Sequence, residues 1–237
     1  MRCAAIYVCV THGERTADFC ARFSATWNQF PPGADCDLIV ACQGGPLDTE
    51  TSLLFASLNA RFWPRVNDEA RDLGAYLDAA KSISSDYEMM LCLGESVHFH
   101  REGWLKRLVE ARERYGPGLY GPFGTYVIRA HLQTTAFFCP PSFLREYPLK
   151  VTNRKERYEF EHGERALWRR LRMRNVPVKL VTWDGEWEPR RWRTPPNVIW
   201  KGDQSNCLMF CNHTDDWRDA DDQRKGNWQR SADRAFK

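Results

Sequence analysis

Three short apolar runs, each followed by a longer segment of helical spacing, most constrain what this 237-residue chain can fold into. The runs cover residues 6–10, 38–42 and 87–93. Apolar residues recur every three or four positions in the segments that follow these runs. These segments are residues 15–30, residues 72–85 and a stretch that ends at Gly116. This alternation is typical of a parallel or mixed sheet wrapped by helices. The sequence predicts a single α/β, Rossmann-like domain with a mixed, mostly parallel central sheet flanked by helices.

The second half of the chain is less regular. It predicts an apolar strand over residues 136–139, then a helix that Asn175 ends, then a strand over 178–183. From residue 215 the chain is rich in Asp, Arg and Gln and loses its periodicity. Because no repeat or long linker interrupts the chain, we expect one domain over 1–214 and a charged, flexible tail over 215–237.

Composition limits the partners and the compartment. A net charge of +3 is too small to indicate nucleic acid. The nine cysteines include no C-x-x-C pair, and Cys207, Cys211 and His213 lack the second ligand cluster of a zinc site. We therefore expect reduced thiols and a cytoplasmic protein. The apolar stretch within the first residues, MRCAAIYVCVTHGE, is too short for a signal peptide. No stretch approaches the roughly 20 apolar residues of a membrane span.

Polar residues follow each of the three predicted strands. In open α/β sheets, ligands bind beyond the carboxyl ends of the strands. The sequence therefore predicts one binding crevice formed by Thr11, His12, Gly13, Glu14, Gln43, Gly94, Glu95 and Ser96.

Six segments occur in an order that resembles GT-A-type glycosyltransferases, with the nearest likeness to bacterial family-two-like and rhamnan-synthesis-like enzymes. They are IYVCVTHGE, DLGAYLDAAKSISSDYEMMLCLGES, GWLKRLVEA, HLQTTAFF, FEHGE and GDQSN, and the resemblance covers roughly residues 5–210. It implies transfer of a sugar from a nucleotide-diphosphate sugar to a hydroxyl of a glycan or lipid-linked acceptor, as in surface polysaccharide synthesis. It also implies that the crevice residues and Asp72 bind the donor.

Glu95 departs from the family pattern. The central strand of most such enzymes ends in an Asp-x-Asp pair that holds a divalent cation, whereas this chain has Gly94-Glu95-Ser96. Glu95 with Ser96 is able to hold Mg²⁺ or Mn²⁺ through water, to bond a sugar hydroxyl without metal, or simply to cap the turn. These alternatives stay open, and so does metal dependence.

The resemblance also implies a catalytic base and an acceptor floor. Glu161, at an expected helix start, would take the proton of the acceptor hydroxyl, with His162 assisting and Asp184 as a second candidate. Both acids have structural alternatives, because a helix start favours acids and Asp-Gly favours a turn. The acceptor would be contacted by His131, Thr134, Asp203 and Gln204.

Two further features leave alternatives. An arginine-rich stripe over residues 165–174 fits either a peripheral membrane contact or a solvated helix face. Binding of nucleic acid is not indicated, because aromatic residues do not interleave with the arginines as they do in single-strand binding sites. A nucleotidyltransferase is disfavoured because the loop THGERTAD is short of glycine. A non-catalytic domain of the same fold, binding a glycan, a nucleotide or a protein, is the main alternative function.

Overall fold

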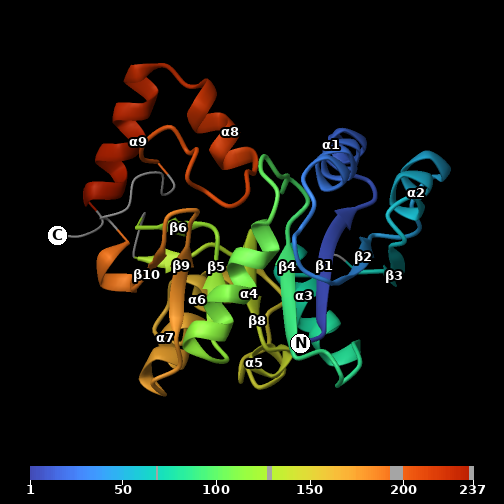
Figure 1. The fold of residues 1–237 in the computed structure, drawn as a ribbon, viewed down its shortest axis with the longest axis horizontal. Helices are drawn as coiled ribbons and strands as arrows, with labels where there is room; N and C mark the ends of the chain where they lie inside the picture. Colours follow the sequence, from blue (N-terminus) through green and yellow to red (C-terminus); the bar gives the residue numbers. More distant parts are fainter. Residues whose placement is uncertain (68, 127–129, 193–199, 235–237) are drawn as a thin grey trace.

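An eight-stranded sheet forms the centre of the computed structural model, which describes residues 1–67, 69–126, 130–192 and 200–234 (Figure 1). The strand order is β10-β9-β5-β8-β4-β1-β2-β3. In chain order the strands are β1 Cys3–Val10, β2 Asp37–Gln43, β3 Arg61–Arg65, β4 Met89–Leu93, β5 Leu119–Gly121, β8 Ala136–Cys139, β9 Val178–Val181 and β10 Glu186–Trp187. A separate two-stranded sheet pairs β6 Gly124–Thr125 with β7 His131–Leu132.

The sheet is mixed and mostly parallel, as the sequence predicted. Strands β3, β2, β1 and β4 run parallel to one another. The antiparallel β8 separates β4 from β5, β5 is parallel to β9, and β10 closes the far edge antiparallel to β9. The carboxyl ends of β1, β2 and β4 therefore point the same way.

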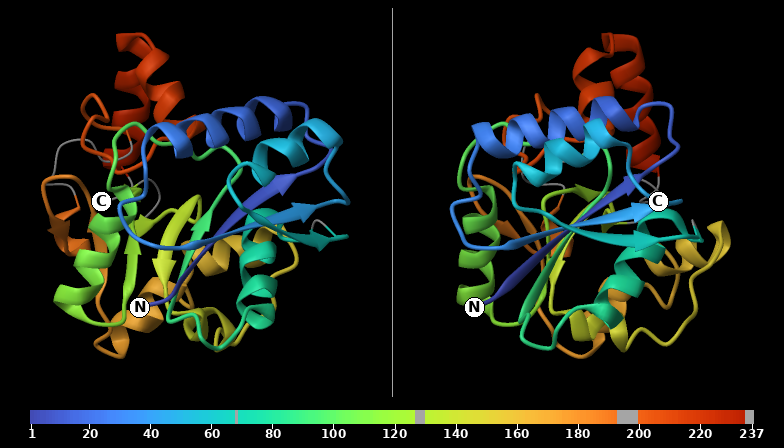
Figure 2. Two further views of the ribbon diagram at one scale, coloured as in Figure 1. Left: turned by 45° about the vertical axis from the view of Figure 1, so that its right-hand side comes forward. Right: turned by 90° about the vertical axis from the view of Figure 1, so that its right-hand side faces the viewer.

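Strand β1 shows why helices cover both faces of the sheet (Figure 2). Its residues are buried on both sides: Ala4, Ile6 and Val8 belong to one hydrophobic core, and Tyr7 and Cys9 belong to the other. A strand buried on both faces needs a continuous apolar run, and CAAIYVCV supplies it.

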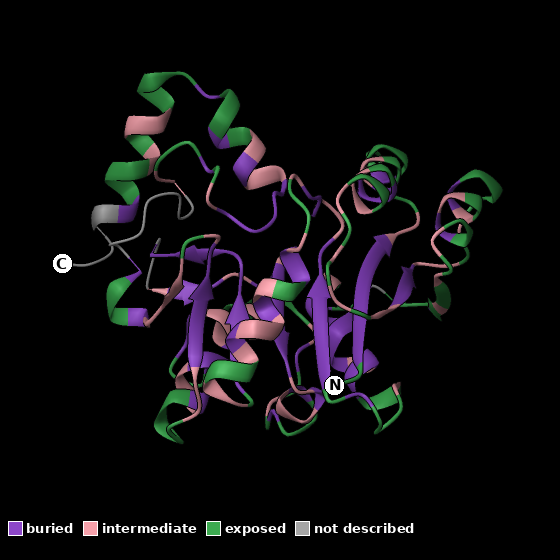
Figure 3. Ribbon diagram, viewed as in Figure 1, coloured by how far each residue is buried: buried purple, intermediate pink, exposed green. Residues whose placement is uncertain are grey.

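One face of the sheet is covered by α1 Thr16–Gln29, α2 Thr49–Ala56 and α4 Trp104–Tyr115. The other face is covered by α3 Arg71–Ser82, α5 Pro141–Arg145, α6 Arg154–Glu161 and α7 Leu167–Met173. The short 3-10 helix η1 Pro189–Arg191 follows β10. The inner strands of the sheet and the inner faces of these helices are buried (Figure 3), whereas the edge strand β3 is largely exposed.

Two helices follow where the sequence predicted a frayed tail. They are α8 Asn212–Asp219 and α9 Asp222–Arg234, and they lie beyond the carboxyl ends of the strands (Figure 1). Their polar composition hid a small apolar side, on which Trp217 and Ala232 are buried. The Trp200 ring lies 4.6 Å from that of Trp228 and 6.0 Å from that of Trp217. The boundary between a domain of 1–214 and a tail of 215–237 stays a prediction, but the described part of that tail is helical.

The described helices include none that is both long and apolar enough to cross a membrane.

Candidate functional site

A cavity of about 880 Å³ opens at the carboxyl ends of β1, β2 and β4. Nine predicted site residues line it: Gln43, Asp72, Gly94, Glu95, Ser96, His131, Thr134, Glu161 and His162. Residues that the sequence analysis did not select complete it, among them Phe19, Arg71, Gln133, Arg157, Trp200, Asn212 and His213. The crevice expected from the strand ends is therefore present, and it is larger than the strand ends alone define.

Glu95 joins the end of β4 to the end of β1. One carboxylate oxygen, Oε1, accepts a hydrogen bond from the Val10 backbone N–H at 3.3 Å. The Thr16 hydroxyl lies 3.0 Å from the same oxygen, and the Glu95 carbonyl accepts a hydrogen bond from the Tyr7 hydroxyl. Burial raises the pKa of Glu95, against the effect of the Thr16 contact. Glu95 thus has a structural task and still faces the cavity.

A charged pair lies on the α3 side of the cavity. Arg157 Nη2 of α6 lies 2.9 Å from Asp72 Oδ1 in the first turn of α3, and both side chains are about three-quarters buried. Burial raises the pKa of Asp72, opposed by Arg157 and reinforced by Glu161. Arg71, whose φ of 52° is left-handed, begins α3 beside this pair. The amino end of α3 therefore brings a positive helix terminus and an exposed guanidinium to the cavity.

Glu161 lies in a cluster of hydrogen-bonding side chains. It is the last residue of α6, so the expectation that it begins a helix is wrong. The Thr134 hydroxyl donates to Glu161 Oε1, and His162 Nε2 lies 3.6 Å from Oε2. The His131 ring meets the His162 ring edge-on at 4.1 Å. Four predicted residues, two from residues 131–134 and two from residues 161–162, thus meet in one cluster.

Two glutamine oxygens in the cavity wall have no partner among the described residues. Gln43 is 1% exposed at the end of β2, and its Oε1 accepts no hydrogen bond there. Gln133 Oε1 is likewise buried without a partner. A buried acceptor left unsatisfied costs about 1–3 kcal/mol. Both oxygens therefore retain unused capacity to accept a hydrogen bond.

The C-terminal segment, residues 200–234, forms the remaining wall of the cavity. Asn212 Oδ1 accepts a hydrogen bond from the Ser96 hydroxyl at 3.0 Å, which ties α8 to the loop after β4. His213 meets the Trp200 ring edge-on at 5.9 Å. Burial lowers the pKa of His213, while Asp216 and Glu161 act in the opposite direction.

Four predicted donor residues lie outside the residues that line the cavity. Thr11, His12, Gly13 and Glu14 form the loop after β1, next to the lining residue Val10. Thr11 Oγ1 donates to the Gln43 carbonyl at 3.1 Å, and His12 Nε2 lies 3.1 Å from the Gly44 carbonyl. These contacts hold the loop against the end of β2, and a donor-binding role for the loop stays a prediction.

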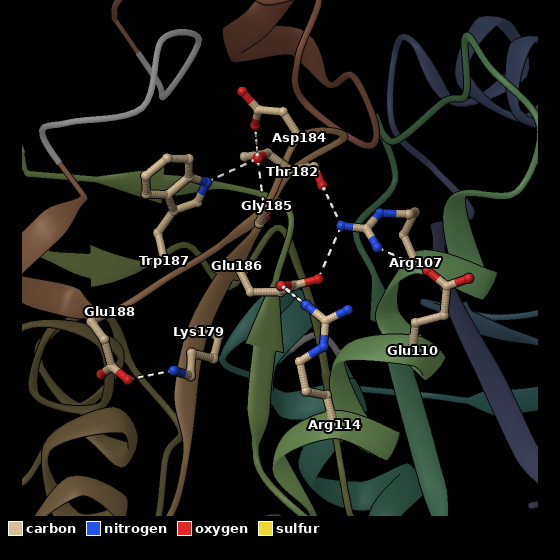
Figure 4. A network of polar contacts seen from close by, with 10 residues as sticks. All are labelled: Arg107, Glu110, Arg114, Lys179, Thr182, Asp184, Gly185, Glu186, Trp187 and Glu188. Atoms are coloured by element: carbon tan, nitrogen blue, oxygen red, sulfur yellow. Dashed lines mark hydrogen bonds and ion pairs between the residues drawn. The ribbon is translucent and has the colours of Figure 1, made fainter.

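Asp184 also lies outside the lining, in a network of polar contacts between β9 and β10 (Figure 4). Its Oδ1 accepts hydrogen bonds from Thr182 Oγ1 at 2.7 Å and Asn206 Nδ2 at 2.6 Å. Although burial acts in the opposite direction, these two bonds lower the pKa of Asp184. A carboxylate held in this way stabilises the turn and is a weaker candidate for a base than Glu161.

Asp203 and Gln204 lie in a turn away from this cavity. Asp203 Oδ1 accepts hydrogen bonds from the backbone N–H of Ser205 at 2.9 Å and its hydroxyl at 2.7 Å. Gln204 is fully buried, with Nε2 donating to the Lys201 carbonyl at 2.6 Å. Both side chains shape the turn, and a role in acceptor binding stays a prediction.

The described side chains do not form a site that holds a metal ion with protein ligands alone. Among residues 1–67, 69–126, 130–192 and 200–234, no three His, Cys, Asp or Glu side chains form a group able to hold a metal ion. Glu95 Oε1 is engaged by Val10, and Asp72 is paired with Arg157. Glu95 therefore offers at most its second oxygen, Oε2, to a Mg²⁺ or Mn²⁺ ion, and metal binding by Glu95 stays a prediction.

No protein-family model and no curated protein sequence matches the chain. Solved structures share its fold at low identity. Staphylococcus aureus TarS 1–349 in complex with UDP is 10% identical with a TM-score of 0.51, over 76% of this chain and 57% of that one. Mannosyltransferase PcManGT from Pyrobaculum calidifontis, in complex with GDP-Man and Mn²⁺, is 8% identical with a TM-score of 0.46, over 62% and 46%. CMP:2-keto-3-deoxy-manno-octonic acid synthetase complexed with CTP is 9% identical with a TM-score of 0.49, over 76% and 89%.

The likeness to TarS concerns the fold. The resemblance to GT-A-type glycosyltransferases is thus confirmed at that level, and the chain is an α/β domain of this architecture. In these matches the chain spans less than two thirds of the length of the TarS and PcManGT structures.

Several lining residues carried only weak sequence signals. Arg157 and Arg71 stand among many arginines, and nothing in the spacing brings either to Asp72. Trp200 begins a stretch whose polar composition indicates a turn, and Asn212 and His213 lie just before the predicted tail. The signal that points to Trp200 is the chain's content of ten tryptophans, because flat apolar rings often line sugar or base sites.

Proposed function

We propose that the protein is a nucleotide-sugar-dependent glycosyltransferase that moves a sugar to a hydroxyl of a glycan acceptor. The observation that carries this proposal is the Glu161 carboxylate, held by Thr134 and His162 in a cavity at the carboxyl ends of β1, β2 and β4. A nucleotide and a sugar together need a cavity of this size class.

In the proposed reaction, Glu161 takes the proton of the acceptor hydroxyl as its oxygen attacks the anomeric carbon of the donor sugar. A new carbon–oxygen bond forms, and the bond to the nucleoside diphosphate breaks. The leaving diphosphate takes the electron pair, and the proton stays on Glu161. His162, 3.6 Å from Glu161, positions the carboxylate or receives the proton in turn.

The donor would lie toward β2 and α3. Gln43 Oε1 would accept a hydrogen bond from the nucleotide, since it has no partner among the described residues. Arg71 and the amino end of α3 would face the diphosphate. A divalent cation, when bound beside Glu95 and the phosphates, would add positive charge that stabilises the leaving group.

The wider setting is proposed on separate grounds. All nine cysteines are free thiols and eight are buried, which supports a reducing, cytoplasmic compartment. The arginines of α7 support a peripheral contact with an anionic membrane surface, where a lipid-linked acceptor would be found. Synthesis of a surface polysaccharide or glycoconjugate is the process that these features suit.

The test is nucleotide binding followed by turnover. Thermal shift and calorimetry with UDP, GDP, dTDP and CMP, each with and without Mn²⁺ or Mg²⁺, should identify one nucleotide class. Release of that nucleotide from its sugar conjugates is then measured with glycan acceptors. Glu161→Gln should keep nucleotide binding and lose about 10²–10⁴-fold in turnover.

Glu164→Gln is the matched control, since this exposed acid lies three residues further on. Absence of binding for every nucleotide would reject the transferase and favour a domain that binds a glycan or a protein. Equal turnover in Glu161→Gln and the wild-type protein would reject Glu161 as the base.

A further inference from the structure

The wall of the cavity opposite the sheet is aromatic and comes from the C-terminal segment. Trp200 lines the cavity and is only partly buried. Behind it the ring of Trp228 stacks at 4.6 Å with an interplanar angle of 29°, and Trp217 packs at 6.0 Å. The Trp217 indole N–H donates to the Gly202 carbonyl at 2.6 Å, which holds the group in place. Trp200 is thus a braced indole with part of its surface toward the cavity.

Polar groups surround this indole. His213 stands edge-on to it at 5.9 Å, and Asn212 precedes His213 at the start of α8. Gln133 Oε1, in the same cavity, is buried and has no partner among the described residues. His213 and Glu161 both line this cavity.

This combination suits a pyranose ring. A flat apolar face accepts the C–H face of a sugar, while amide and imidazole groups around it exchange hydrogen bonds with the hydroxyls. The lowered pKa keeps His213 neutral near pH 7, so that one ring nitrogen donates and the other accepts. A lipid chain would leave these polar groups unsatisfied, and a bare phosphate would not use the indole.

We propose that Trp200, His213 and Asn212 form a subsite for a sugar ring of the acceptor, which presents a hydroxyl to Glu161. The proposal rests on the proposed glycosyltransferase function and adds to it that the acceptor is a carbohydrate at the reacting end. It assigns acceptor binding to Trp200, Asn212 and His213 instead of Asp203 and Gln204, which lie in the turn between them.

The test is saturation-transfer NMR on the full chain, with saturating UDP, GDP, dTDP or CMP present. The probes are the methyl α- and β-glycosides of glucose, galactose, mannose, rhamnose and N-acetylglucosamine. We expect transfer to the C–H protons of one face of at least one glycoside. Trp200→Ala should weaken that glycoside about three- to tenfold, and Trp200→Phe should weaken it less. Trp63→Ala, in the edge strand β3 and outside the cavity lining, should leave the affinity unchanged.

Nucleotide binding by the same variants separates this proposal from the one on which it rests. Unchanged glycoside affinity in Trp200→Ala, with nucleotide binding intact, would overturn the subsite and leave the transferase. Absence of saturation transfer for every glycoside while a nucleotide binds would do the same. Glycoside binding that depends on Trp200, with no nucleotide bound by the wild-type protein, would support the subsite and reject the transferase. If Trp200→Ala does not fold, the comparison of Trp200→Phe with the wild type decides.

Discussion

Asp215 should hold the C-terminal segment against α1, and its removal is the perturbation that best tests how the cavity wall is built. Asp215 Oδ2 lies 2.8 Å from Arg22 Nη1, with the two side chains 24% and 33% exposed. Asp215 Oδ1 lies 3.5 Å from His98 Nε2, where burial lowers the pKa of the histidine. The interaction with Arg22 is therefore the charged one at neutral pH.

The size of the effect follows from this partial burial. Fully exposed ion pairs contribute about 0.2–1 kcal/mol, whereas breaking a buried pair costs about 3–5 kcal/mol. A pair about one quarter to one third exposed lies between these limits and nearer the lower one, so Asp215→Ala should cost about 1–2 kcal/mol. For a chain of this length that corresponds to a fall in Tm of roughly 2–8 °C.

The assay is urea denaturation of Asp215→Ala, Arg22→Ala and the double variant, with unfolding monitored by circular dichroism. The double-mutant cycle should give a coupling energy of about 1 kcal/mol. Asp219→Ala, an exposed acid on the same helix, should change stability by less than about 0.5 kcal/mol. Hydrogen exchange over residues 200–234 should accelerate in Asp215→Ala and in Arg22→Ala but not in Asp219→Ala. A coupling energy indistinguishable from zero would refute the assignment of this pair as the anchor of α8.

Three further predictions concern single side chains. Glu186→Ala should cost about 2–3 kcal/mol in urea denaturation, because its carboxylate is 5% exposed and paired with Arg107 at 3.0 Å and Arg114 at 2.7 Å. Glu146→Ala, whose side chain and partner Arg174 are 60% and 61% exposed, should cost less than about 1 kcal/mol, and equal costs for the two variants would contradict this expectation. Glu95→Gln should stabilise the protein at pH 7, because folding raises the pKa of the Glu95 carboxyl. A carboxyl whose pKa is raised in the folded state makes the protein less stable as pH rises above about 4.5, so the gain in stability of Glu95→Gln should vanish below that pH. A lower stability of Glu95→Gln at pH 7 would contradict the raised pKa. Gln43→Leu should leave the free energy of unfolding unchanged or higher by up to about 2 kcal/mol, because it removes an unsatisfied buried acceptor, while calorimetry should show weaker nucleotide binding; unchanged binding would exclude Gln43 from the donor site.

The central sheet was predictable because its strands are buried on both faces. Burial on two faces requires unbroken apolar runs, and such runs are visible in β1, β2 and β4 without any knowledge of their neighbours. The ends of those runs then identified Gln43, Glu95 and Ser96, since parallel strands bring their carboxyl ends together. Strand β3, with Pro64 inside it, and the two-residue strands carry no such run and were not predicted.

The C-terminal wall was not predictable, because its order depends on contacts between distant residues. Helices α8 and α9 are polar over most of their surface, and Trp217 and Trp228 pack against each other and against Trp200 from an earlier part of the chain. A short polar helix has little stability of its own. Only the tertiary contacts, such as those of Asn212 with Ser96 and Asp215 with Arg22, make this segment part of the site.

The position of Glu161 is the strongest argument from structure to function. The sequence predicted Glu161 at the start of a helix, whereas the structure places it at the end of α6. A helix start would favour a carboxylate, whereas the carboxyl end of a helix disfavours it by about 0.3–1 kcal/mol. The fold keeps Glu161 at that end of α6, fixes its backbone carbonyl through the Trp168 indole N–H at 3.1 Å, and supplies Thr134 and His162 to its carboxylate. An acid that opposes the local rule and is supported by groups from other elements is typical of a functional residue. The same conflict explains why Glu161→Gln should lose turnover without losing stability: the substitution removes a charge that the helix end does not favour and keeps an oxygen for Thr134.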